Sequence, residues 1–217
     1  PGLAEEIMIS RNVSLAEYAK ARLHFATVST ARSVEIIRNA KKQGIRVTAE
    51  VAAHHLSLDD SALEEFDTNF KINPPLRGKK DVKALVKGLS DGTIDVICSD
   101  HAPEDVESKK REFDGAAFGA IGLETAYAAA NTFSQLTPEQ LVDKLSISPR
   151  RILGVNIPFI HVGEKANFTL FDPKFKWTFT EEAIKSKSTN SPFKGREFTG
   201  KALGVYNNGK FMNCSII

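Results

Sequence analysis

Short apolar, β-branched runs alternate along the first 160 residues with stretches in which apolar positions recur every three or four residues. The runs predict buried strands and the longer spacing predicts amphipathic helices, an alternation typical of parallel βα units. Strands are expected at 22–28, 45–53, 69–73 and 94–99. Helices are expected near 15–19, 30–44, 57–66, 80–89, 119–133, 138–146 and 149–153.

The pattern changes toward the C-terminus. Residues 167–171 and 177–179 alternate apolar and polar positions as edge strands do, and Asn-Asn-Gly at 207–209 is a hairpin signal. We therefore expect two units, a βα region at 1–160 and a small β-rich appendage at 161–217.

The predicted βα units are too few to close a barrel by themselves. Four units supply half of the strands that a (β/α)8 barrel needs, so an α/β fold containing half a barrel is expected. The chain starts at Pro1, with no initiator methionine and no signal-peptide pattern. We therefore interpret this chain as a piece of a longer protein.

Composition narrows the classes of function. The 29 Lys and Arg residues nearly balance the 27 Asp and Glu residues, and a net charge of +2 does not suggest a nucleic-acid-binding surface. No apolar run reaches the length needed to cross a bilayer. Cys98 and Cys214 lie far apart, so no structural disulfide is expected and a cytoplasmic location is predicted.

Polar residues stand at the ends of three predicted strands, at Thr27, His54-His55 and Asp100-His101. Active sites of parallel barrels form at that face, which favours a functional role. The carboxylate of Asp100 can bind a divalent metal and accept a proton from metal-bound water, although a turn or helix-cap aspartate is the alternative. His54 is a candidate metal ligand, with a capping or surface histidine as the alternative.

The segment 73–77, Asn-Pro-Pro-Leu-Arg, lies between these two candidates. Its prolines predict a rigid, extended turn. The amide of Asn73 and the guanidinium of Arg77 could then face an anionic substrate.

Together these segments resemble dihydroorotases and related cyclic amidohydrolases. Asp-His-Ala-Pro at 100–103 resembles an element whose aspartate is both metal ligand and catalytic base. Glu-Val-Ala-Ala-His-His-Leu at 50–56 is similar to Glu-Val-Thr-Pro-His-His-Leu, in which the first histidine binds metal. Asn-Pro-Pro-Leu-Arg between them is almost diagnostic of dihydroorotases. Further similar segments, which extend the resemblance over essentially the whole chain, are 118–125, 148–154, 163–172, 191–195 and 208–210.

The resemblance implies the second half of a (β/α)8 barrel with a small C-terminal β appendage, and zinc as cofactor. It assigns metal binding to His54 and Asp100 and catalysis to Asp100, with His55 as a structural neighbour. The positions that it assigns to substrate binding are Asn73, Arg77, Glu104, Ala117 and Gly119.

Three positions depart from the family pattern. Thr27 stands where Arg-x-His-x-x-His-x-Ser-Thr has its second, metal-binding histidine, and a neutral hydroxyl is a poor zinc ligand. His24 cannot simply replace it, because residues three apart on a strand face opposite sides. Glu104 replaces a substrate-binding histidine and would repel a substrate carboxylate. Ala117 replaces a proline, which is a milder change.

Two functions remain open. One is a dihydroorotase, which closes N-carbamoyl-aspartate to dihydroorotate in pyrimidine biosynthesis and catalyses the reverse hydrolysis. Hydantoinase or allantoinase is a nearby alternative that the segment 73–77 argues against. The other function is a non-catalytic homologue that acts as a scaffold for aspartate transcarbamoylase, which Thr27 and Glu104 motivate.

The two candidate ligands, His54 and Asp100, are fewer than the roughly three protein ligands of a catalytic zinc. Weak or absent zinc, and no turnover by this polypeptide alone, are therefore expected. The expected partners are dihydroorotate or N-carbamoyl-aspartate, a second copy in a homodimer, and aspartate transcarbamoylase. Neither nucleic acid nor a membrane is expected as a partner.

Overall fold

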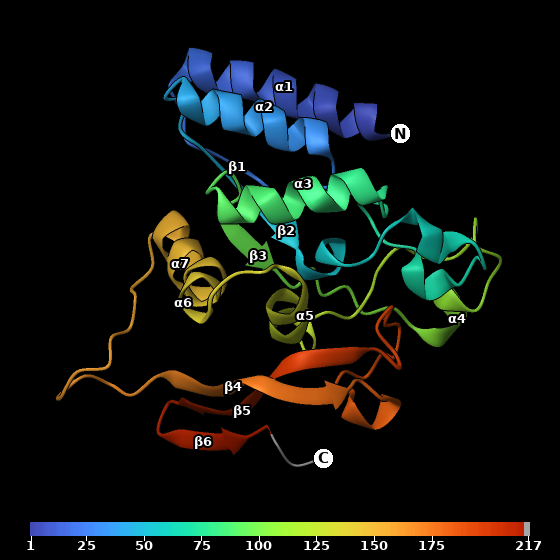
Figure 1. The fold of residues 1–217 in the computed structure, drawn as a ribbon, viewed down its shortest axis with the longest axis vertical. Coiled ribbons are helices and arrows are strands. Elements are labelled where there is room, and N and C mark those ends of the chain that lie inside the picture. Colours follow the sequence, from blue (N-terminus) through green and yellow to red (C-terminus); the bar gives the residue numbers. More distant parts are fainter. Residues whose placement is uncertain (215–217) are drawn as a thin grey trace.

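A computed structural model describes residues 1–214, which form a parallel and an antiparallel three-stranded sheet. Helices cover the outer face of the parallel sheet, and the antiparallel sheet lies at the opposite end of the molecule (Figure 1). Among the described residues, no helix is both long and apolar enough to cross a membrane.

The parallel sheet has the order β1-β2-β3, formed by Leu23–Phe25, Val47–Ala52 and Val96–Cys98. Its register pairs Glu50 with Val96, so β2 and β3 are direct neighbours. Because all three strands run the same way, their C-terminal ends meet at one edge. That edge carries the polar residues found in the sequence.

The two faces of β2 differ in polarity. The odd-numbered residues Val47, Ala49 and Val51 are almost fully buried beneath the helices. The even-numbered residues Thr48 and Glu50 are half-buried on the other face. One face of the strand therefore packs in the core while the other carries polar chemistry, as alternation of side chains along a strand requires.

Three long helices, α1 (Gly2–Ala19), α2 (Ala31–Lys42) and α3 (Lys79–Ser90), pack side by side over the apolar face (Figure 1). Helix α2 begins where the side chain of Thr30 accepts a hydrogen bond from the Ser33 amide, a cap that satisfies an otherwise unpaired amide of the first turn. The residues that fix these helices to the sheet are fully buried and apolar: Val34, Ile37, Ala40, Leu85, Leu89 and Ile94.

The expected strand at 69–73 is wrong, and the parallel sheet has three strands instead of four. Thr68–Phe70 form a 3-10 helix (η3), and the following residues up to 78 have no regular hydrogen-bonding pattern. Pro74 and Pro75 have no amide hydrogen to donate to a ladder, so the segment cannot pair as a strand.

The expected helix at 57–66 is also wrong. The chain there forms only a short 3-10 helix, η2 (Asp60–Leu63), because the Asp59 carboxylate accepts hydrogen bonds from the Ser61 amide and hydroxyl and closes a local turn. Another 3-10 helix, η1 (Ala53–Leu56), directly continues β2 and carries the histidine pair.

The helix expected at 119–133 begins only at residue 126, as α5 (Ala126–Phe133). The preceding residues run against the end of β3, and a side chain at Gly122 would collide with the Ser99 carbonyl. The amides of Gly122 and Leu123 donate to Nδ1 of His101 at 3.1 and 3.3 Å, which fixes this non-helical path. The remaining helical segments are α4 (Val106–Lys109), α6 (Pro138–Val142), the π-helix η4 (Asp143–Ile147), α7 (Ser148–Leu153) and η5 (Glu181–Ala183).

The antiparallel sheet contains β4 (Phe168–Thr178), β5 (Glu197–Asn207) and β6 (Lys210–Asn213). The two short strands expected at 167–171 and 177–179 form the single strand β4. This strand is irregular because register shifts interrupt its pairing with β5. The predicted hairpin at 207–209 is confirmed as the turn between β5 and β6.

Helix α5 joins the two sheets. The side-chain amide of Asn131 donates to the carbonyls of Thr199 and Pro173, at 2.8 and 3.0 Å. The Trp177 indole donates to the Gly200 carbonyl within the antiparallel sheet. A division of the chain near residue 160 stays a prediction.

Candidate metal and substrate site

The C-terminal ends of the three parallel strands bring Thr27, His54 and Asp100 to one edge of the sheet. His54 Nε2 lies 3.5 Å from Asp100 Oδ2. Thr27 and Asp100 both adopt positive φ angles, 45° and 44°, so the chain turns sharply directly after β1 and β3. The structure thus places the two predicted ligands side by side, and their roles stay predictions.

His54 is 3% exposed, and its Nε2 atom has no hydrogen-bond partner in the described part of the chain. Burial, and secondarily the neighbouring His55, hold the pKa of His54 well below its ordinary value. The imidazole is therefore neutral near pH 7. A neutral imidazole with an unused nitrogen is the state in which histidine binds a metal.

Asp100 is half-buried, and its pKa is raised first by burial and then by the charge of Glu50. A raised pKa makes a carboxylate a stronger proton acceptor. This electrostatic setting is suited to general-base chemistry.

Glu50 is the centre of a polar cluster that sequence reasoning missed. Its carboxylate lies 3.2 Å from His24 Nε2, and Thr27 and Cys98 also help to lower the pKa of Glu50. The hydrogen bond from His24 is the largest influence that lowers the pKa of Glu50. Burial raises the pKa of the Cys98 thiol, which stays neutral. The signal in the sequence that could have revealed this cluster is Glu50 itself, a charged residue within a strand of mostly apolar residues.

His55 is 1% exposed and its Nε2 atom lies 3.1 Å from the Pro74 carbonyl. Burial lowers its pKa to about 4, so it is neutral and serves as a hydrogen-bond donor to that carbonyl. The contact attaches the segment 73–77 to the end of β2.

Arg77 lies at the base of the loop that follows β1, on the side of α1. Its Nε atom donates to Ser29 Oγ at 3.0 Å, and Nη2 lies 3.7 Å from Glu5 Oε2. Glu5 also accepts hydrogen bonds from the Ser29 and Thr30 amides. The guanidinium thus already has a carboxylate partner from α1, which local sequence reasoning did not anticipate. Its contact with substrate stays a prediction.

Asn190, from the segment between β4 and β5, connects two stretches of the predicted substrate site, one at Ala102 and Glu104 and the other at Gly119. Its amide nitrogen donates to the carbonyls of Ala102 and Gly119, and its oxygen accepts from the Glu104 amide. Gly119 has φ 143°, and a Cβ there would lie 2.7 Å from the Ala102 carbonyl oxygen. Only glycine therefore allows the two stretches to approach so closely. The sequence gives one hint of this role, because Asn190 directly precedes the stretch 191–195, which is similar to the family.

The donor set does not by itself fit a catalytic zinc. No group of three His, Cys, Asp or Glu side chains in residues 1–214 is arranged to hold a metal ion. His54 and Asp100 are two candidate donors, and Thr27, at the third predicted position, carries only a neutral hydroxyl. Zinc in catalytic sites takes about three protein ligands that are imidazole, thiolate or carboxylate.

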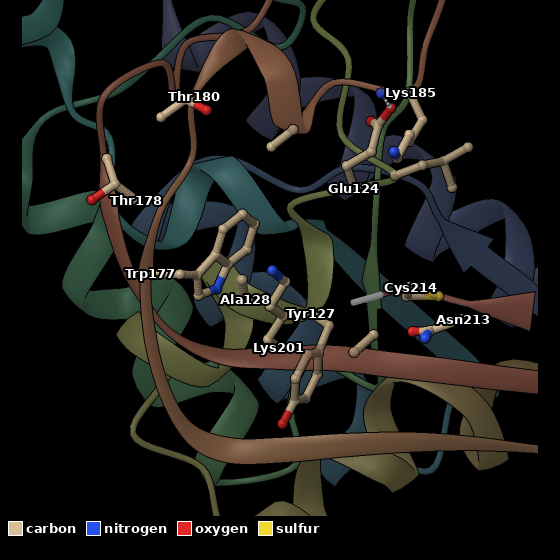
Figure 2. Close-up of a pocket in the computed structure, with 13 residues that line it drawn as sticks. Glu124, Tyr127, Ala128, Trp177, Thr178, Thr180, Lys185, Lys201, Asn213 and Cys214 are labelled. Atoms are coloured by element: carbon tan, nitrogen blue, oxygen red, sulfur yellow. Dashed lines mark hydrogen bonds between the residues drawn. The ribbon is translucent and has the colours of Figure 1, made fainter. Parts of the chain in front are cut away.

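A cavity of about 540 Å³ lies elsewhere, between α5 and the antiparallel sheet. Figure 2 shows Tyr127, Trp177 and Lys201 along it, with Glu124 at one end accepting a hydrogen bond from the Lys185 amide. No residue of the predicted site lines this cavity. The candidate site is therefore the edge of the parallel sheet.

A family model described as the amidohydrolase family matches residues 4–212. The chain belongs to this family. It is 44% identical over 213 residues to the dihydroorotase of Acetivibrio thermocellus, which covers 96% of this chain and 50% of that relative. It is 47% identical over 199 residues to the dihydroorotase of Ruminiclostridium cellulolyticum, covering 90% of this chain and 46% of that relative.

Solved structures of amidohydrolases share the fold. The L-hydantoinase (dihydropyrimidinase) of Arthrobacter aurescens superimposes with a TM-score of 0.91 at 27% identity, covering 98% of this chain and 49% of that one. The dihydropyrimidinase of Brevibacillus agri gives a TM-score of 0.88 at 28% identity, covering 97% and 49%. The chain is thus a dihydroorotase-like amidohydrolase that spans about half the length of the relatives it matches.

Proposed function

We propose that this chain carries part of the active site of a dihydroorotase, which interconverts N-carbamoyl-aspartate and dihydroorotate. The supporting observation is the contact of 3.5 Å between His54 and Asp100 in a chain 44–47% identical to dihydroorotases. In this proposal residues 1–160 are the second half of a barrel and 161–217 are an appendage.

Asp100 is the proton carrier of the proposed reaction. In the hydrolytic direction, the oxygen of water bonds to the ring amide carbon while its proton passes to the Asp100 carboxylate. The C–N bond of the ring then breaks, and the same proton goes to the departing nitrogen. The raised pKa of Asp100 supports both the acceptance and the return of this proton.

The proposed substrate contacts come from two loops. Asn73 and Arg77 supply an amide and a guanidinium from the proline-containing segment. Ala117 and Gly119 belong to the second loop, near Glu104, and their proposed role is to shape the substrate site, since their amides and carbonyls are bonded within the protein. The guanidinium is the group best suited to an anionic substrate, since it binds carboxylates through two parallel hydrogen bonds.

A scaffold function is the second candidate, and one observation favours it. Thr27 has a neutral hydroxyl where the dihydroorotase pattern has a metal-binding histidine. A non-catalytic homologue with weak or absent zinc would be the consequence. Its proposed partners are a second copy of the chain or aspartate transcarbamoylase.

The two functions separate in one experiment on the natural full-length protein. Dihydroorotate hydrolysis is measured for that protein, for Asp100→Asn and for the matched control Asp60→Asn, which alters an exposed carboxylate. A dihydroorotase should lose about 10²–10⁴-fold of its rate in Asp100→Asn and little in the control. Absence of turnover, with aspartate transcarbamoylase co-purifying, would support the scaffold. Turnover of hydantoin or allantoin in preference to dihydroorotate would contradict both proposals.

A further inference from the structure

Two buried lysines face the predicted substrate loop, and neither is used in the proposed chemistry. Lys71 and Lys109 are each 7% exposed. Burying an ammonium group is costly unless hydrogen bonds replace its water. The hydrogen-bond acceptors of the two ammonium groups therefore show which parts of the chain the lysines hold in place.

Lys109 binds main-chain oxygens. Its Nζ atom donates to the carbonyls of Ala117 and Gly119 at 3.0 Å each, and lies 3.4 Å from the Lys71 carbonyl. Burial lowers the pKa of Lys109, an effect that the charges of Glu104 and then Asp67 oppose.

Lys71 holds the other end of the same loop. Its Nζ atom donates to the carbonyls of Phe113 and Asp114 at 2.6 and 2.7 Å. It also lies 4.7 Å from the ring centre of Phe118 and 5.5 Å from that of Phe113. An ammonium over aromatic faces gains a further electrostatic attraction.

The two lysines share a contact at the main chain of residue 71. The Lys71 carbonyl accepts from the Gly119 amide at 3.0 Å as well as from the Lys109 ammonium. Asn73, a predicted substrate residue, follows two positions later. The loop 113–119 and the segment that leads to Asn73 are therefore fastened to each other at both ends.

Charge explains why lysine is suited to this place. Neither ammonium forms an ion pair with a carboxylate anywhere in residues 1–214, and carbonyl oxygens are the acceptors instead. One ammonium has three donor hydrogens and can bind several carbonyls that converge from different parts of a loop. An apolar side chain of similar length would remove these hydrogen bonds from the carbonyls of Phe113, Asp114 and Ala117.

We propose that Lys71 and Lys109 are positioning residues, which preorganise the predicted substrate loop 113–119 against the segment carrying Asn73. This inference rests on the proposed function only for the identity of the ligand. The geometric part concerns the loop alone and has its own measurement.

The first measurement is hydrogen exchange of the peptide 111–122 in the natural full-length protein. Lys109→Met removes the ammonium but keeps the side-chain length, and Lys110→Met changes its exposed neighbour. Hydrogen bonds to charged groups are worth about 1.5–3 kcal/mol, so exchange in this peptide should become about tenfold faster or more in Lys109→Met. Lys110→Met should match the natural protein, and a peptide from β2 should be unchanged in both variants. Equal exchange in the two methionine variants would overturn the proposal.

The second measurement is calorimetric binding of dihydroorotate to the same proteins. Lys109→Met and Lys71→Met should each weaken binding about tenfold, and Lys110→Met should leave it unchanged. Lys109→Gln keeps two of the three donor hydrogens and should show a smaller loss, which keeps the test decisive if a methionine variant does not fold.

The outcomes distinguish the two proposals. Faster loop exchange in a natural protein that binds no dihydroorotate would support the positioning of the loop and overturn the proposed function. Tight binding by the natural protein that persists in folded Lys109→Met and Lys71→Met would support the function and overturn the positioning role.

Discussion

The Nε2 atom of His54 lies 3.5 Å from Oδ2 of Asp100, across the C-terminal ends of two neighbouring parallel strands. The histidine is buried and neutral, and its ring nitrogen has no hydrogen-bond partner within the described residues. The backbone next to Thr27 is tied to the same edge, since the Val28 amide donates to the Glu50 carbonyl at 2.9 Å. The position of residue 27 is thus well defined, although its hydroxyl is a poor metal ligand.

We predict that Thr27→His increases zinc binding by the natural full-length protein. An imidazole at this position would add a third donor beside His54 and Asp100. Elemental analysis after dialysis should find more zinc per chain in the variant than in the natural protein. The double variant Thr27→His, His54→Gln should return to the natural level. Equal zinc contents in the natural protein and in Thr27→His would contradict the prediction.

A second prediction concerns Glu104. Two like charges about 4 Å apart repel by about 4 kcal/mol at an effective dielectric of 20, and even a third of that weakens binding about tenfold. Glu104→His should therefore bind dihydroorotate about tenfold more tightly in a calorimetric titration at neutral pH. Glu107→His, at an exposed position of the neighbouring helix α4, is the control and should have little effect. Unchanged or weaker binding in Glu104→His would mean that Glu104 does not face the substrate.

The Glu5 carboxylate should be a stabilising group of the fold. It accepts hydrogen bonds from the Ser29 and Thr30 amides and from the Ser29 hydroxyl, and it lies next to Arg77. Since hydrogen bonds to a charged group are worth about 1.5–3 kcal/mol, Glu5→Gln should lower the free energy of unfolding by about 2 kcal/mol. Urea denaturation measures this value. Glu17→Gln, on an exposed turn of the same helix, should change it by less than about 0.5 kcal/mol.

Removing the Tyr127 hydroxyl should not lower the free energy of unfolding, in contrast to the change at Glu5. Its hydroxyl is buried without a hydrogen-bond partner among residues 1–214, so Tyr127→Phe should leave thermal stability unchanged or raise it by up to about 1 kcal/mol. The control Tyr18→Phe, at a side chain that is 90% exposed, should have no effect. A loss of more than 1 kcal/mol in Tyr127→Phe would reveal a partner for the hydroxyl.

The same residue predicts a pH dependence. Burial, and then the charge of Asp172, raise the pKa of Tyr127 to about 12 from 10. The unfolded chain therefore loses this proton first, so the contribution of Tyr127 to stability is present below pH 10 and is lost as the pH rises to 12. Thermal denaturation between pH 9 and 12 should show a shallower decline in Tyr127→Phe than in the natural protein. Parallel declines would contradict the assigned pKa.

The sequence by itself determined the elements that depend on local pattern. The apolar runs at β1, β2 and β3 and the helical spacing of α2 and α3 are visible in the residues, because burial on one face imposes a period of two or about four. The cap at Thr30 and the hairpin after Asn207 are likewise local signals. The strand ends then indicated the edge that carries His54 and Asp100, since parallel strands share their C-terminal side.

Only the tertiary structure decided which distant groups meet. The segment 69–73 has strand-like residues, but the following prolines cannot donate to a ladder, and β3 pairs with β2 in its place. Arg77 is paired with Glu5, and Lys71 with the carbonyls of Phe113 and Asp114, through contacts between distant segments. The energy of a buried charge depends on partners brought from elsewhere in the chain, so no local pattern of residues contains it.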